Sequence, residues 1–284
     1  MTEDHSGAYI DAHVHVWTDD LQRYPLARPF TIRDMKPPVY SPEQIVREAR
    51  PSGVDRVVLV QMSYYGFDNS FMLEAIKQAP QVFRGIAVVD GNGPAPDVQM
   101  RALAKFGVRG FRLYPDEVLL ATRGREGFRK VFQCGAEERL AICLLTNPDA
   151  LRDTDRQCEE FPDTPVVIDH LARIGMSGTI RDADVADLCR LARHPEVTVK
   201  VSAFYALGEA KPPHMDLVSL IRRVYEAYGP KRLMWGSDCP FQTVHESYED
   251  SLSVIRDRLD FFSNDDKEWL LGKTAEQIFF APRV

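Results

Sequence analysis

Two histidines, His13 and His15, are separated by a single residue at the end of an apolar segment near the start of the chain, Tyr9–His15. Side chains two residues apart in a strand point to the same face, so both imidazoles should enter one cavity. Neutral imidazoles arranged in this way can ligate a single divalent cation. Two core histidines bonded to backbone groups are the alternative, but the acidic residue described next favours a functional pair.

Asp238 ends the last apolar segment, Leu233–Asp238, within the sequence WGSDCP. If the strands close into a barrel, the first and last strands are neighbours, and this carboxylate lies beside the histidine pair. A carboxylate in that position can bind a metal and can accept a proton from an attacking water molecule. The alternative is a structural role for Asp238, in a turn or as a helix cap.

Further polar residues follow other apolar segments. His170 is expected to be a third ligand or a hydrogen-bond donor to a substrate carbonyl, whereas its neighbour Asp169 should point to the other face in a structural role. Arg112 and Tyr114 end another segment on one face, where the guanidinium could hold a substrate carboxylate or form a structural ion pair.

Three more residues are candidates for contact with a substrate. Lys200 ends the seventh segment and could bind substrate or pair with a neighbouring carboxylate. Gln61 ends the second segment and Tyr65 follows it, at the level where the active-site loops of a barrel begin.

The elements that must position these residues alternate along the chain. The predicted strands are Tyr9–His15, Arg56–Gln61, Phe83–Val89, Val108–Tyr114, Leu140–Thr146, Pro165–His170, Val197–Ser202 and Leu233–Asp238. The predicted helices are Pro42–Arg50, Asp68–Ala79, Asp97–Phe106, Glu126–Glu138, Pro148–Phe161, Asp182–Arg193 and His214–Tyr228. Near-continuous apolar strands that alternate with amphipathic helices are typical of a parallel sheet covered on both sides.

The pattern favours an α/β fold with a single (β/α)8 TIM barrel over residues 1–284, because no glycine-rich phosphate turn follows an early strand. Residues 1–8 are expected to form a flexible tail. The stretch Trp17–Val39, rich in proline and arginine, is expected to cross the barrel mouth and to help select the substrate.

Composition excludes several classes of function. A net charge of −7 provides no general basic face for nucleic acid, and the longest apolar runs are too short to span a bilayer. The acidic start of the chain does not resemble a secretory signal, and five scattered cysteines indicate reduced thiols. These features predict a soluble cytoplasmic enzyme or binding protein whose partner is a small molecule. Composition does not determine the oligomeric state, and a homo-oligomer is compatible with it.

Six motifs together resemble the amidohydrolase superfamily, in particular its amidohydrolase-2 branch of TIM-barrel hydrolases. They are IDAHVHVW at 10–17, VLVQ with YGFDN at 58–69, GVRGFR at 107–112, VIDH at 167–170, VKVS at 199–202 and WGSDCP at 235–240. The stretch from Gln61 to Asn69 is most similar to the lactonases of this family, which include pyrone-dicarboxylate and sugar-acid lactonases.

The resemblance implies hydrolysis of a small cyclic ester, with Asp238 as general base and with His13, His15 and His170 around the carbonyl. It places Arg112 near a carboxylate or hydroxyl group of the substrate. It also implies a possible zinc or manganese ion on His13, His15 and Asp238, with His170 as a further ligand. The chain has Thr146 and Asn147 where many mononuclear members have a fifth-strand histidine, so a metal-free site remains an equal alternative.

Two other functions remain as alternatives. One is a metal-dependent non-oxidative decarboxylase of the same family, which the missing fifth-strand histidine disfavours. The other is a non-catalytic barrel that binds a small molecule, which would leave His13, His15 and Asp238 without a chemical role.

Overall fold

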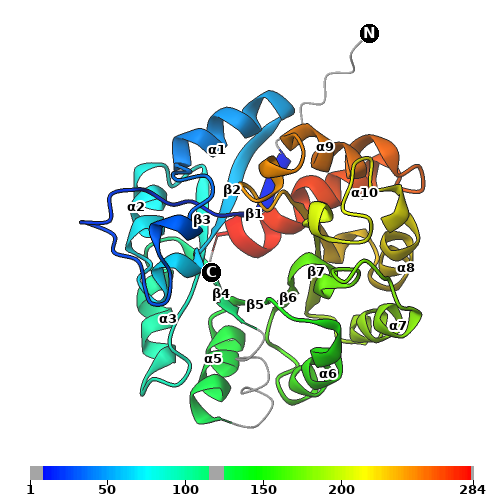
Figure 1. Cartoon of the computed structure of the whole chain (residues 1–284). Coiled ribbons are helices and arrows are strands. Elements are labelled where there is room, and N and C mark those ends of the chain that lie inside the picture. Colours follow the sequence, from blue (N-terminus) through cyan, green and yellow to red (C-terminus); the bar gives the residue numbers. More distant parts are fainter. Residues whose placement is uncertain (1–8, 115–124, 283–284) are drawn as a thin grey trace.

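Eight parallel strands with helices between them form a nearly closed barrel (Figure 1). The computed structural model describes residues 9–114 and 125–282, so the expected tail at residues 1–8 lies outside the described residues. The strands are β1 (Tyr9–Val14), β2 (Val54–Val60), β3 (Phe83–Ala87), β4 (Val108–Leu113), β5 (Ala141–Leu144), β6 (Val166–Ile168), β7 (Val197–Ser202) and β8 (Leu233–Gly236). Each pairs with the next strand along the chain, which confirms the predicted TIM barrel.

The barrel is joined between β1 and β8 at the level where both strands end. Val14 and Cys239 form a parallel bridge, the amide of His15 donates to the carbonyl of Cys239 at 2.8 Å, and the amide of Asp238 donates to the carbonyl of His13 at 2.9 Å. Asp238 therefore lies beside the histidine pair, as the predicted topology requires.

Helices lie outside the strands in the expected order. They are α1 (Pro42–Ala49), α2 (Ser70–Gln78), α3 (Pro96–Ala104), α5 (Glu126–Glu137), α6 (Leu151–Glu160), α7 (Asp182–Arg190) and α8 (Val218–Tyr228). The first begins as its sequence predicts, because Ser41 accepts a hydrogen bond from the amide of Gln44 and Pro42 occupies the first helical position.

Two further helices, α9 (Tyr248–Ser253) and α10 (Asn264–Glu268), were not predicted. They are only six and five residues long, and π-helical turns follow them at Val254–Arg258, Trp269–Lys273 and Glu276–Phe280. The π-turns interrupt the 3.6-residue period by which a helix is recognised in a sequence.

The interior of the barrel is filled by inward-facing strand residues and by the last helical turn. Phe279 and Ala275 pack against a cluster that comprises Ile10, Ala12, Val58, Val60, Ile86, Ala141, Cys143, Val167 and Met234. Arg56 pairs with Glu276 near the start of β2, so this turn closes the end at which the strands begin. The opposite end is left for the candidate site.

The segment 17–39 does not cross the barrel mouth as expected. Tyr24 packs against Phe71 of α2, with ring centroids 5.0 Å apart, and its hydroxyl bonds to Glu74. Trp17 packs against Tyr64 and Phe241. These aromatic contacts hold Tyr24 against α2 and Trp17 against Phe241, a residue of the cavity wall described below, and no residue of 17–39 lines that cavity. No helix among the described residues combines the length and the apolarity needed to span a membrane.

Candidate active site

A cavity of about 340 Å³ opens where the strands end. Five of the predicted site residues line it, namely His15, Arg112, Tyr114, His170 and Asp238. Its remaining lining consists of Met62, Ser63, Leu145, Arg173, Met176, Ala203, Tyr205, Ala206, Leu207 and Phe241. Apolar walls with a few converging polar groups are the usual composition of a small-molecule site.

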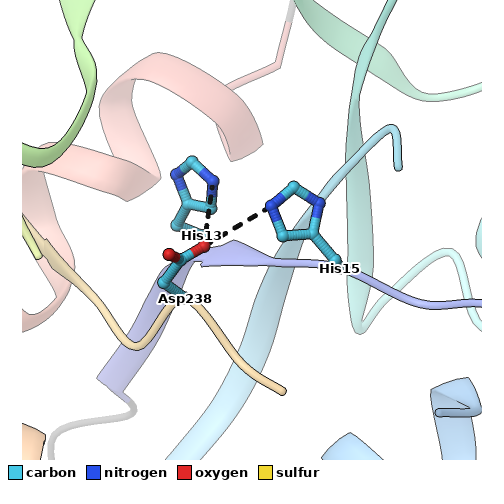
Figure 2. A group of neighbouring side chains, drawn as sticks. All are labelled: His13, His15 and Asp238. Atoms are coloured by element: carbon cyan, nitrogen blue, oxygen red, sulfur yellow. Dashed lines mark ion pairs between the residues drawn. The ribbon is translucent and has the colours of Figure 1, made fainter. Parts of the chain in front are cut away.

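The histidine pair is presented by an irregular part of β1. Asp11 pairs with Val57 and Val14 with Leu59, so three steps along β1 match two along β2. Such a bulge changes the side to which the following residues point, and Figure 2 shows His13 and His15 directed toward Asp238. His15 lines the cavity, whereas His13 is fully buried beneath it.

Asp238 lies among three imidazoles. Its Oδ1 is 3.6 Å from His13 Nε2 and 3.4 Å from His15 Nε2, and its Oδ2 is 3.9 Å from His170 Nε2. The residue has a left-handed backbone with φ of 65°, a conformation that costs a non-glycine residue about 1 kcal/mol. Strain of this kind is often retained at functional sites.

Tyr205 is a contact of Asp238 that the sequence did not reveal. Its hydroxyl donates to Asp238 Oδ2 at 2.8 Å, and its ring stacks on His245 with centroids 5.2 Å apart. Tyr205 follows β7 in a short helical turn, Phe204–Ala206, that begins after the left-handed residue Ala203. A tyrosine in a loop carries no spacing signal, so its partner could be identified only in the folded chain.

His170 begins a left-handed turn. Residues 170 to 173 all have positive φ, between 51° and 58°, although none is glycine. The turn brings His170 Nδ1 to 2.8 Å from the hydroxyl of Ser202 on β7, while Nε2 faces Asp238.

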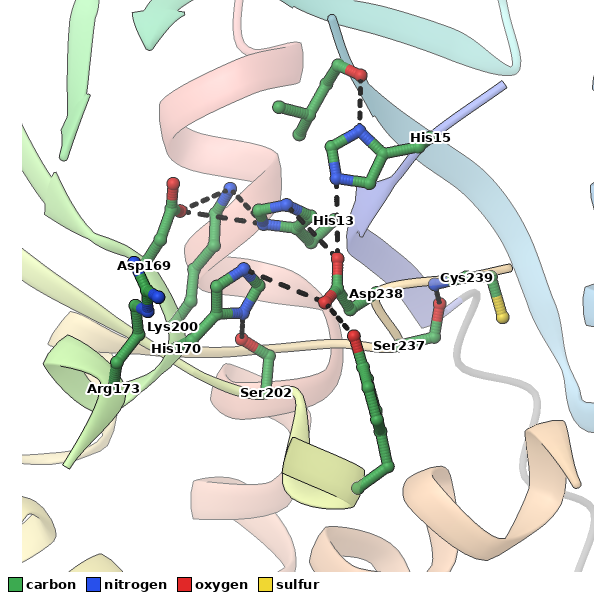
Figure 3. Close-up of polar contacts among 12 residues, drawn as sticks. His13, His15, Asp169, His170, Arg173, Lys200, Ser202, Ser237, Asp238 and Cys239 are labelled. Atoms are coloured by element: carbon green, nitrogen blue, oxygen red, sulfur yellow. Dashed lines mark hydrogen bonds and ion pairs between the residues drawn. The ribbon is translucent and has the colours of Figure 1, made fainter. Parts of the chain in front are cut away.

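Asp169, Lys200, Arg112 and His13 form a buried charge network, of which Figure 3 shows Asp169, Lys200 and His13. The side chain of Asp169 lies 3.1 Å from Lys200 Nζ and 3.1 Å from Arg112 Nη2. The same two cations contact His13, with Lys200 Nζ 3.2 Å from Nδ1 and Arg112 Nη2 2.9 Å from Nε2. Asp169 therefore does not point away from the site as predicted, because β6 ends at Ile168 and strand alternation stops there.

These surroundings fix the protonation states. Burial, together with Lys200, holds the pKa of His13 well below its usual value, and burial lowers the pKa of His170 to about 4. Burial alone would raise the pKa of Asp238, but the imidazoles of His170, His15 and His13 outweigh it and keep that pKa low. At neutral pH the site holds an ionised Asp238 beside neutral His13 and His170.

Hydrogen-bond partners also distinguish the imidazoles. His15 Nδ1 lies 2.9 Å from the carbonyl of Val60, which can only accept, so a neutral His15 carries its proton there and its Nε2 is an acceptor. Nε2 of His13 faces a guanidinium, which can only donate. His170 differs, since a serine hydroxyl can donate to Nδ1 and leave an N–H on Nε2, the atom that faces Asp238.

The donor set fits a divalent cation in part. One nitrogen each of His13 and His15 and one oxygen of Asp238 lie within 4.8 Å of one another, and all three residues are buried. Asp238 Oδ1 has no hydrogen-bond partner among the described residues, which leaves it free to coordinate. His13 Nε2 is less free, because Arg112 donates to it and would have to move.

The other predicted contacts lie outside the cavity. Gln61 is buried, and its amide donates to the carbonyl of Asp68 at 2.6 Å. The hydroxyl of Tyr65 accepts from the amide of Thr18 at 3.0 Å. The hydrogen bonds of Gln61 and Tyr65 stabilise the loop after β2. Lys200 belongs to the buried charge network and does not line the cavity.

Comparison with known proteins places these features in a family. The chain is 27% identical to the 4-sulfomuconolactone hydrolase of Hydrogenophaga intermedia over 244 residues, which cover 84% of this chain and 76% of the relative. It is 27% identical to the 2-pyrone-4,6-dicarboxylate hydrolase of Comamonas testosteroni over 254 residues, which cover 85% and 79%.

A solved structure has the same fold. The structure of a probable 2-pyrone-4,6-dicarboxylic acid hydrolase from Acinetobacter baumannii, with citric acid bound, superposes with a TM-score of 0.79 at 25% identity. The match covers 96% of this chain and 99% of that chain. The family model described as amidohydrolase matches residues 10–281, which contain the β1 histidines, His170 and Asp238. The chain belongs to the amidohydrolase family.

Proposed function

We propose that this protein hydrolyses a small lactone, with Asp238 as the general base. The observation that carries the proposal is an ionised, buried carboxylate that lines the cavity and has one oxygen without a hydrogen-bond partner among the described residues. The relatives named as hydrolases of sulfomuconolactone and pyrone dicarboxylate support the substrate class. The five free cysteines support a cytoplasmic location.

In the proposed reaction, Asp238 Oδ1 accepts a proton from water as the water oxygen attacks the lactone carbonyl. The Nε2–H of His170 donates to the carbonyl oxygen, on which negative charge develops. The bond from the carbonyl carbon to the ring oxygen then breaks, and Asp238 returns its proton to that oxygen. The products are a carboxylate and a hydroxyl group on one open chain, with the carboxylic proton released to solvent.

The other residues would maintain these protonation states. His15 presents an acceptor nitrogen and can hold the attacking water, whereas burial, together with Lys200 and Arg112, lowers the pKa of His13 and keeps it neutral. A zinc or manganese ion held by His13, His15 and Asp238 would supply Lewis-acid polarisation of the carbonyl when bound. The steps assigned to Asp238 and His170 do not depend on it.

A panel of lactones, with acid release followed by a pH indicator, tests the proposal alongside metal analysis of the purified protein. Asp238→Asn should reduce turnover by roughly a thousandfold or more, since an amide cannot accept the proton. The variant should retain the fold and ligand binding. Unchanged turnover in Asp238→Asn, or release of carbon dioxide from an aromatic acid with no lactone opened, would overturn the proposal.

A further inference from the structure

The guanidinium of Arg173, in the cavity wall, differs from the other charged groups of the site in its hydrogen-bond partners. Arg173 lines the cavity, and among the described residues its Nε and Nη2 hydrogen-bond only to the sulfur of Met176, at 3.2 and 3.1 Å. A thioether is a weak acceptor. Arg173 forms no ion pair with any carboxylate among residues 9–114 and 125–282. Its strong donors therefore have no strong acceptor among these residues.

The second guanidinium of the cavity is already neutralised. Arg112 donates through Nε and Nη2 to Asp169 Oδ2, at 3.3 and 3.1 Å, and Asp169 is fully buried. A substrate carboxylate would have to compete with this buried pair to bind Arg112. No carboxylate among residues 9–114 and 125–282 competes for Arg173 in this way. Partial burial, together with the nearby positive charge of Arg112, lowers the pKa of Arg173.

The backbone directs Arg173 to the same cavity as His170. Residues three apart in a tight helical turn have eclipsed side chains, and this holds for either hand of the turn. His170 and Arg173 occupy such positions in the left-handed turn, and both line the cavity. Leu171 and Ala172 between them are buried. The strained turn thus carries a proposed carbonyl donor at one end and, at the other, a cation that has no carboxylate partner among the described residues.

We propose that Arg173 binds an oxyanion substituent, such as a carboxylate, on the ring of the substrate. The apolar lining from Met62, Leu145 and Phe241 would contact the ring itself. A guanidinium can hold a carboxylate through two parallel hydrogen bonds, which fixes orientation as well as affinity. This inference rests on the proposed function for the substrate class, and it assigns the anion contact to Arg173 instead of Arg112.

The test compares an anionic lactone with its neutral methyl ester for the wild type, Arg173→Gln and Arg173→Lys. Loss of a charge-assisted contact should raise KM for the anionic lactone roughly 10- to 100-fold in Arg173→Gln, with kcat nearly constant. The preference for the anionic over the neutral lactone should fall by the same factor, and Arg173→Lys should lie between. Arg181→Gln, which alters an exposed arginine paired with Asp184, is the matched control and should keep the wild-type preference.

Binding measured by calorimetry separates this inference from the proposed function. Isophthalate, which has no lactone to open, should bind the wild type and Asp238→Asn at least tenfold more tightly than isophthalamide, and this preference should be lost in Arg173→Gln. If no lactone is hydrolysed but isophthalate binding still depends on Arg173, the result supports the anion site and contradicts the proposed lactone hydrolysis. Equal binding of the two probes by the wild type would overturn the anion site, even if the variants did not fold.

Discussion

The hydroxyl of Tyr205 is one of the groups that orient the Asp238 carboxylate, through a hydrogen bond of 2.8 Å to Oδ2. In Tyr205→Phe, kcat should fall roughly tenfold or more, because a hydrogen bond to a charged group contributes about 1.5–3 kcal/mol. KM should change little, since the bond holds the carboxylate and not the substrate. Steady-state kinetics on a lactone give both constants.

Tyr225→Phe is the matched control for this prediction, because that hydroxyl bonds to Asp266 outside the cavity. Its kcat should equal that of the wild type. A Tyr205→Phe variant that raised KM with an unchanged kcat would instead place the hydroxyl against the substrate.

His170 should make the stability of the fold depend on pH. Burial lowers its pKa to about 4 in the folded chain, below the unfolded value of about 6.5. Between these values the unfolded chain binds the proton and the folded chain does not, so stability falls as pH falls through this window. The shift corresponds to roughly 3 kcal/mol.

Urea unfolding of the wild type and of His170→Gln at pH 7 and pH 4 checks this expectation. His170→Gln has no imidazole to protonate at this position, so its free energy of unfolding should decline less between pH 7 and pH 4 than that of the wild type. Parallel pH profiles for the two proteins would show that His170 binds its proton equally well in both states.

At the level of the elements, Asp11 connects the two strands that close the barrel. Its Oδ1 accepts from the amides of His13 and Ser237, at 3.1 and 2.9 Å, and its Oδ2 accepts from the hydroxyl of Tyr248. Burial raises its pKa to about 6, so an ionised Asp11 is itself costly at neutral pH.

Asp11→Asn should therefore be tolerated, because its carbonyl oxygen can still accept from both amides. Asp11→Ala leaves two amides and a phenol without their acceptor and should be less stable than Asp11→Asn by roughly 2–4 kcal/mol. Urea unfolding at pH 7 gives the difference. Equal stability of the two variants would mean that water replaces the lost acceptor.

The strands and their order could be predicted from the sequence, because buried parallel strands are apolar runs that end at polar residues. Every predicted strand overlaps an observed one, and His13, His15 and Asp238 meet as the closed topology requires. Prediction failed where the backbone departs from regular geometry. Asp169 follows the end of β6, and the alternation rule cannot describe the left-handed turn that presents Arg173.

For the whole molecule, the last helical turn is part of the barrel core. Phe279 is fully buried among inward-facing residues of the strands, and its ring lies 5.7 Å from Lys200 Nζ in the charge network. Phe279→Ala should lower the free energy of unfolding by roughly 3–5 kcal/mol, as is usual for a large buried aromatic.

Phe106→Ala, at a phenylalanine that is 65% exposed, should change stability by less than about 0.5 kcal/mol and serves as the control. Denaturant unfolding of both variants makes the comparison. A small loss in Phe279→Ala would show that the barrel interior can collapse around the missing ring.

The left-handed turn at residues 170–173 sets the spacing between the proposed carbonyl donor and the proposed anion contact. The backbone fixes this spacing, since both residues belong to one strained turn whose central residues are buried. The turn would therefore select substrates by the distance between two of their groups. It would favour lactones whose charged substituent stands at one particular distance from the bond that is broken, and isomers with the same groups at another ring position would be poor substrates.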